Sequence, residues 1–82
     1  MRITGKLENA LFTAALEAAE DELRGRAIAD PYRVASAATR VALRGTSHLR
    51  ASRLRAEWPE RVHQARVAAR RLVREALEWE EW

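Results

Sequence analysis

The hydrophobic and polar positions along the chain repeat mainly at helical spacing. Residues 6–24 carry two adjoining apolar rows, which are Leu7, Leu11, Ala15 and Ala18 beside Phe12, Leu16, Ala19 and Leu23. Apolar residues three and four positions apart lie on one side of an α-helix. Thr4 is a candidate N-cap and Gly25 a natural end. The pattern predicts a helix over 6–24 with one buried face.

A second helix is predicted to begin at Asp30 and Pro31. Aspartate is a favoured N-cap, and proline suits the first helical position, where its missing N–H costs nothing. Three apolar positions then share one face, Val34, Ala38 and Val41. These features predict a helix over 31–44.

Gly45 interrupts this second pattern. Thr46 or Ser47 could cap a short third helix over 47–57, or the second helix could continue through the glycine at a cost of about 1 kcal/mol. We favour a break at Gly45, with backbone N–H groups of residues 47–49 left free to meet an anion.

The last predicted helix, 59–80, has the most regular pattern in the chain. Pro59 opens it, and six apolar positions follow at alternating steps of three and four: Val62, Ala65, Ala69, Leu72, Ala76 and Trp79. This spacing is typical of a seam that packs against other helices. We expect Trp79 to close the bundle against Trp58 or Phe12, and Trp82 to be a candidate anchor for a partner.

The predicted fold is all-α, a single helical domain over 1–82 with three principal helices, or four if 47–57 stands alone. Alanine accounts for 17 of the 39 hydrophobic residues, and it buries little apolar area. A short chain with so small a core favours self-association. We therefore expect a homo-oligomer, with the seam from Val62 to Ala76 or the Trp79 and Trp82 end contributing to the interface.

The net charge of +3 is unevenly distributed. Residues 31–74 hold eleven arginines against two glutamates, a balance of +9, whereas 1–30 sum to −2 and 75–82 to −4. Such segregation indicates an anionic partner, or acidic ends that neutralise the basic middle.

A basic stripe runs beside the seam of the last helix. It consists of His63, Arg66, Arg70 and Arg74, with Arg71 off it toward the far side. Arginine presents a planar fork of donors to phosphate oxygens, and successive helical turns repeat every 5.4 Å. The stripe could hold a polyanion, or it could be a solvated face paired with Glu78, Glu81 or the acidic end of the first helix.

The stretch "VHQARVAARRLV", residues 62–73, resembles the signature helix of the conserved-histidine α-helical domain (CHAD) family. That pattern reads His-x-x-Arg-Val-x-x-Arg-Arg-Leu. Members of the family are all-helical and bind inorganic polyphosphate through basic residues. The resemblance implies that His63, Arg66, Arg70 and Arg71 contact a phosphate chain.

A second basic patch surrounds Gly45 over residues 43–55 and contains Arg44, Arg50, Arg53 and Arg55. Together with the free N–H groups expected at 47–49, these arginines are candidate anion ligands. A helix-turn-helix arrangement is an alternative, with 31–44 as the first helix and a recognition helix from 47.

Several classes of function lack support in the sequence. There is no cysteine, and His48 and His63 are the only histidines, so we expect no cofactor and no metal site. Without a nucleophile–base constellation or a glycine-rich phosphate loop, we expect no enzyme activity.

No apolar run approaches the roughly 20 residues of a membrane span, and three glutamates in the first 20 residues do not suit a secretion signal. We expect a soluble, cytoplasmic protein.

The functional prediction is a non-enzymatic module that binds polyphosphate or a nucleic-acid backbone. The first alternative is a structural subunit of an oligomer, virion or other complex, held to its neighbours by charge-segregated surfaces. The second is a small DNA-binding protein of helix-turn-helix type.

Overall fold

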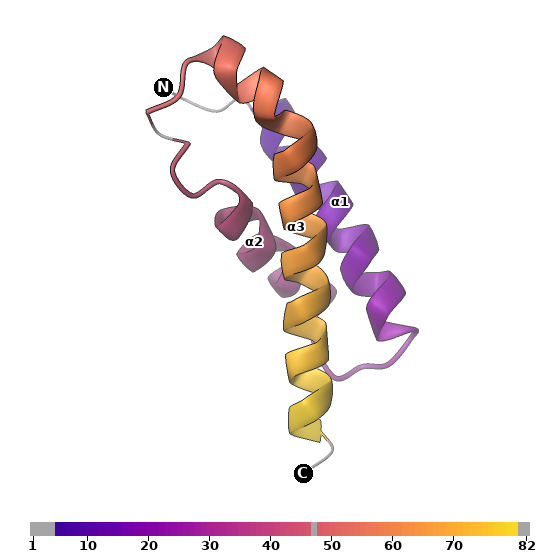
Figure 1. Ribbon diagram of the computed structural model, residues 1–82. Helices are drawn as coiled ribbons and strands as arrows, with labels where there is room; N and C mark the ends of the chain where they lie inside the picture. The colour runs from indigo at the N-terminus through magenta and orange to yellow at the C-terminus, as the bar shows by residue number, and fades with distance from the viewer. Residues whose placement is uncertain (1–4, 47, 81–82) are drawn as a thin grey trace.

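Three helices pack against one another in a small all-α bundle, as the sequence predicts (Figure 1). A computed structural model describes residues 5–46 and 48–80. The helices are α1 (Gly5–Leu23), α2 (Pro31–Ala42) and α3 (Ala51–Glu80). At 1.5 Å per residue the 30-residue α3 is about 45 Å long, and the bundle measures 45 × 19 × 17 Å. α3 therefore sets the length of the molecule.

The ends of α1 and the start of α2 follow their local sequence signals. Arg24 and Gly25 both have positive φ, 52° and 77°, directly after α1 ends. Asp30 caps α2 by accepting a 3.0 Å hydrogen bond from the Tyr32 N–H, and Pro31 takes the first helical position. Both boundaries are confirmed, while Thr4 lies outside the described residues.

The predicted break at Gly45 is also confirmed. α2 ends at Ala42, and Gly45 has a φ of 74°, which favours glycine because it has no Cβ. The predicted helix start at 47 is wrong, since α3 begins only at Ala51. Thr46 does not cap it: its side chain is buried and donates a 2.6 Å hydrogen bond back to the Leu43 carbonyl.

The predicted helices 47–57 and 59–80 form one element, because α3 continues through Pro59. Proline removes the helical donor to the Arg55 carbonyl, but both residues are exposed, so water can reach that carbonyl. Glu57 forms i,i+4 ion pairs with arginines on both sides, one of them across the proline. The first turns of α3 lean away from the rest of the helix (Figure 1), as expected at a proline.

Alanine forms most of the core between the three helices. The buried cluster contains Leu11, Ala15, Ala18, Ala19 and Leu23 of α1, Ala35, Ala38 and Ala42 of α2, and Ala65, Ala68, Ala69 and Val73 of α3. Short side chains allow helix axes to approach closely, which explains a bundle only 19 × 17 Å across. The largest side chains that are fully buried are Leu11, Leu54 and Val73.

The buried face of α1 agrees with the prediction. The buried faces of α2 and α3 are rotated about the helix axis relative to the predicted ones, so that alanines occupy most of the buried positions. In α2 the buried row is Ala35, Ala38 and Ala42, while the predicted Val41 is 36% exposed. In α3, Ala68 and Val73 are buried, whereas Leu72 and Ala76 are only half-buried. The predicted seam is thus an internal packing surface, and its fully buried alanines are not available to a second copy.

Trp79 does not close the bundle. Its side chain is 79% exposed, because α3 extends past the end of α1 and leaves its last turns uncovered (Figure 1). The half-buried Trp58 and Phe12 pack against the core without it. Trp82 lies outside the described residues.

Candidate functional site: two arginine stripes

The α3 stripe, defined as His63, Arg66, Arg70 and Arg74, lies along one helix beside the core. His63, Arg66 and Arg74 are exposed, and Arg70 is half-buried. Three of the four basic side chains of the stripe are therefore open to solvent. Its neighbours decide how much of that charge is available to a ligand.

One member of the α3 stripe is paired inside the molecule. The Arg74 Nε donates a 2.7 Å hydrogen bond to Glu22 at the end of α1. This hydrogen bond lowers the pKa of Glu22, and the charges of Arg74, Arg24 and Arg70 lower it further. The acidic end of α1 is thus the internal counterion that the sequence offered as the alternative to a bound polyanion.

His63 and Arg71 lie on the other flank of α3. They line a shallow groove toward α2, of about 260 Å³, together with Val41, Gln64, Val67 and Ala68. The residues that resemble the polyphosphate-binding signature are therefore divided. Arg70 lies within the field of Glu22 at the α1 side, while His63 and Arg71 border α2.

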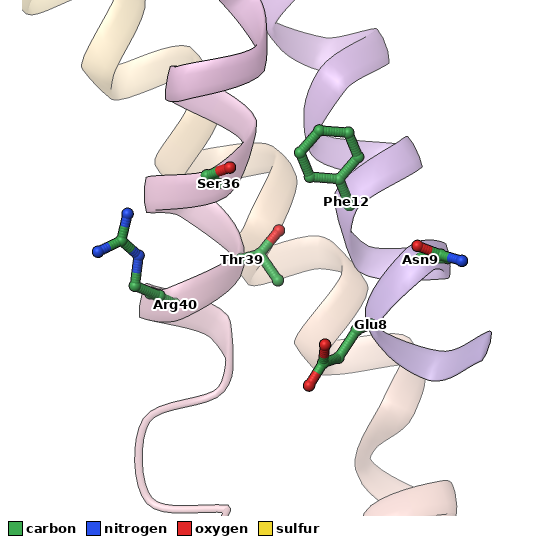
Figure 2. A pocket seen from close by; sticks show the side chains of 6 residues that line it. All are labelled: Glu8, Asn9, Phe12, Ser36, Thr39 and Arg40. Carbon is green, nitrogen blue, oxygen red and sulfur yellow. The ribbon is translucent and has the colours of Figure 1, made fainter. Parts of the chain in front are cut away.

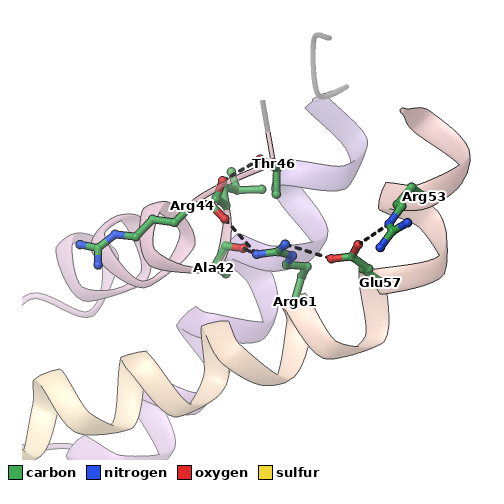
Figure 3. Close-up of polar contacts among 7 residues, drawn as sticks. Ala42, Arg44, Thr46, Arg53, Glu57 and Arg61 are labelled. Carbon is green, nitrogen blue, oxygen red and sulfur yellow. Dashed lines mark hydrogen bonds and ion pairs between the residues drawn. The ribbon is translucent and has the colours of Figure 1, made fainter. Parts of the chain in front are cut away.

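The patch around Gly45 is held together by Arg61 (Figure 3). The Arg61 Nη1 donates to the Ala42 carbonyl at 3.2 Å and to the Arg44 carbonyl at 3.0 Å. Its Nη2 bonds Glu57 at 3.0 Å, and Arg53 bonds the other oxygen of Glu57 at 3.3 Å. These contacts fasten the end of α2 to α3, and they occupy Arg53.

The pKa of Glu57 is lowered by the hydrogen bonds from Arg61 and Arg53, in that order, and by their charges. The sequence did not predict that Arg61 would link the end of α2 to α3. A cation near a helix C-terminus is a known partner for its last carbonyls, but here the helix and the cation are 17 and 19 positions apart.

The anion site expected from free backbone N–H groups at 47–49 is not formed as predicted, because one of these N–H groups is already hydrogen-bonded. The Leu49 N–H donates to the Thr46 carbonyl at 3.0 Å, and Ser47 lies outside the described residues. Arg50 is exposed and directly precedes α3. The eight residues between α2 and α3 also exceed the three or four typical of a helix-turn-helix turn.

A second basic stripe, of which the sequence predicted only Arg44 as an anion ligand, lies on α2 and just after its end. Arg33 and Arg40 lie seven positions apart on the outer side of α2, opposite the buried alanines, and Arg44 follows two residues after the helix ends; all three are exposed. We call these three residues the α2 stripe. The Arg44 side chain points away from the Arg61 network (Figure 3). The spacing, and the absence of carboxylates from 31 to 56, were the available signals.

The outer face of α2 is not neutralised from α1. A groove between these helices is lined by Glu8, Asn9 and Phe12 of α1 and by Ser36, Thr39 and Arg40 of α2. Arg40 points away from Glu8 (Figure 2). Within the described ranges, no carboxylate lies within 4.0 Å of a nitrogen of Arg33, Arg40 or Arg44.

In the part of the chain that the structure describes, no three His, Asp or Glu side chains are grouped so that they could hold a metal ion. Over the same ranges, no helix combines the length and apolar character needed to cross a bilayer.

Comparisons of this chain with protein-family models, with curated proteins and with solved structures find no match. The resemblance of residues 62–73 to the polyphosphate-binding family therefore stays a prediction.

Proposed function

We propose that this chain is a non-enzymatic helical module that binds an extended polyanion, either polyphosphate or a nucleic-acid backbone, mainly through the α2 stripe. One observation carries the proposal: residues 31–56 contain six arginines and no carboxylate. Within the described residues, five of the six have no ion-pair partner, which are Arg33, Arg40, Arg44, Arg50 and Arg55. Charge of one sign without an internal counterion raises the local concentration of anions.

The α3 stripe is the weaker half of this proposal. Arg74 already donates to Glu22, and Arg70 lies within the field of the same carboxylate. An incoming phosphate must compete with Glu22 there. Among the described residues, Arg40 and Arg44 form no ion pair with a carboxylate, so we expect them to contribute more to affinity than Arg66 and Arg70.

Two matched double variants test this difference, Arg40→Glu with Arg44→Glu and Arg66→Glu with Arg70→Glu. Each changes the net charge by the same amount, so a response to overall charge would be equal in both. Fluorescence anisotropy with labelled polyphosphate and with labelled duplex DNA is measured across a salt series. Binding by the unaltered chain should weaken steeply with salt, because phosphate contacts release counterions.

The α2 double variant should lose about two contacts from the salt slope and bind at least about tenfold more weakly than the α3 double variant. Circular dichroism checks that both remain helical. Equal losses would mean a generic basic surface rather than a site. The proposal fails if the unaltered chain binds neither probe at low salt, or if the α2 variant binds as well as wild type.

The alternative of an interaction subunit is favoured by a different observation. Trp79 is 79% exposed on an uncovered helical end, and tryptophan is among the residues that most often anchor protein interfaces.

A further inference from the structure

A row of exposed side chains follows the outer side of α3 at four-residue spacing. It consists of Val67, Arg71, Glu75 and Trp79, and we call it the outer ridge. Val67 is 38% and Trp79 79% exposed. Residues four apart form the ridges that interdigitate when helices pack. Val67 and Arg71 border the groove toward α2, and all four members of the ridge are open to solvent.

We propose that two copies of this chain pair through the outer ridge, with their α3 helices antiparallel about a two-fold axis near Val73. In such a pair, residues equally far from position 73 on opposite sides face each other. Arg71 then meets Glu75 of the second copy, and Val67 meets Trp79. A two-fold interface requires this kind of self-complementarity, and the order apolar, basic, acidic, apolar provides it.

The charges at the centre of the ridge are those of Arg71 and Glu75. Among the described residues, neither Arg71 nor Glu75 takes part in an ion pair. An ion pair between residues four apart on a helix is more favourable when the acidic residue comes first in the sequence. Here Arg71 precedes Glu75, which is the less favourable order. Both side chains are therefore available to a neighbouring molecule.

The groove beside Val67 offers a place for the indole of Trp79. Its lining combines the apolar Val41, Val67 and Ala68 with the polar His63, Gln64 and Arg71. At about 260 Å³ it is smaller than the roughly 300–1,000 Å³ of most small-molecule pockets, and it suits a single side chain. An exposed tryptophan and a shallow apolar groove on the same ridge become mutually covered in the antiparallel pair.

This pairing does not depend on the proposed polyanion binding. The α2 stripe lies outside the outer ridge, and of the earlier candidate ligands only Arg71 belongs to the ridge, with His63 in the adjoining groove. Four residues per copy form a small interface by the standard of stable dimers. We therefore expect a dimer that dissociates in the micromolar to high-micromolar range.

Charge reversal tests the central contact by sedimentation equilibrium up to about 1 mM protein at low salt. Arg71→Glu or Glu75→Arg alone places like charges opposite each other twice per dimer, and each should weaken association about tenfold. The double variant exchanges the two charges and should restore association to within about twofold. Glu17→Arg, an exposed change on α1, is the matched control and should leave it unaltered.

Trp79→Ala should also weaken association about tenfold or more, whereas Tyr32→Ala, another exposed aromatic, should not. Circular dichroism confirms that each variant is folded. The double Arg40→Glu/Arg44→Glu variant, which tests the polyanion site, should dimerise like wild type. The two proposals can therefore fail separately.

Orientation is tested with a single spin label, since the chain contains no cysteine. Ala56→Cys places the label on an exposed position near the start of α3. An antiparallel pair centred at 73 separates the two labels by about 51 Å along the helix axis, while a parallel pair brings them to roughly 10 Å. A monomer at 1 mM, a short label distance, or single reversals that the double variant does not rescue would overturn the proposal.

Discussion

Arg74 donates a 2.7 Å hydrogen bond to Glu22 across 52 positions of sequence. The pair joins the end of α1 to the C-terminal part of α3. It also gives part of the basic stripe a counterion within the molecule. Whether a given arginine is free to bind an anion therefore depends on contacts between distant segments.

The Glu22 and Glu57 carboxyls predict how stability depends on pH. Both have a folded-state pKa below the ordinary 4.5. A lowered carboxyl pKa contributes stability above the unfolded pKa and loses it as the pH falls through the folded value. Urea denaturation should thus show a smaller free energy of unfolding at pH 3 than at pH 7. Glu22→Gln should reduce this difference, whereas Glu17→Gln, at an exposed position, should preserve it. An unchanged difference in Glu22→Gln would contradict the assignment.

Arg61→Ala should destabilise the bundle by about 2 kcal/mol. The side chain is only 16% exposed and bonds two carbonyls at the end of α2 as well as Glu57. Hydrogen bonds from a charged group contribute about 1.5–3 kcal/mol, and the carbonyls of the last turn would lose a partner. Chemical denaturation measures the loss, with the exposed Arg55→Ala as the control. A loss no greater than that of Arg55→Ala would show that water replaces the contact.

Pro59→Ala should stabilise the protein by about 1–3 kcal/mol. Inside a helix, alanine restores the missing N–H and removes the ring clash. If Pro59 instead opened a separate helix, alanine would be neutral or slightly unfavourable there. The urea midpoint therefore separates a continuous α3 from two helices. Backbone chemical shifts of the variant should show helix over 51–80.

Ala38→Leu should destabilise the bundle by about 1–3 kcal/mol through overpacking. Ala38 is fully buried where the helices meet, and the larger side chain would force them apart. The exposed Ala10→Leu on α1 is the control and should change stability by less than about 0.5 kcal/mol. Thermal unfolding followed at 222 nm measures both. A neutral Ala38→Leu would mean that the alanine interface is loosely packed.

The sequence by itself determined the helical class and most helix ends. Asp30 with Pro31, Gly25 and Gly45 act through hydrogen bonds and backbone angles within a few residues, and such local chemistry can be read without a fold. The face of α1 was also predictable, because its apolar positions are numerous and regularly spaced. The basic character of 31–56 required only counting charges.

Tertiary structure decided what depends on distant neighbours. Pro59 lies inside a helix because packing and the Glu57 ion pairs offset its local cost. On α2, alanines are buried and the predicted Val41 is exposed, because closely packed helices leave room only for small side chains at the contact. Trp79 is exposed because α3 extends past the end of α1, and no other described helix covers its last turns. Helical periodicity places an arginine on a face, but only the position of carboxylates and carbonyls tens of residues away determines whether its charge is already bound.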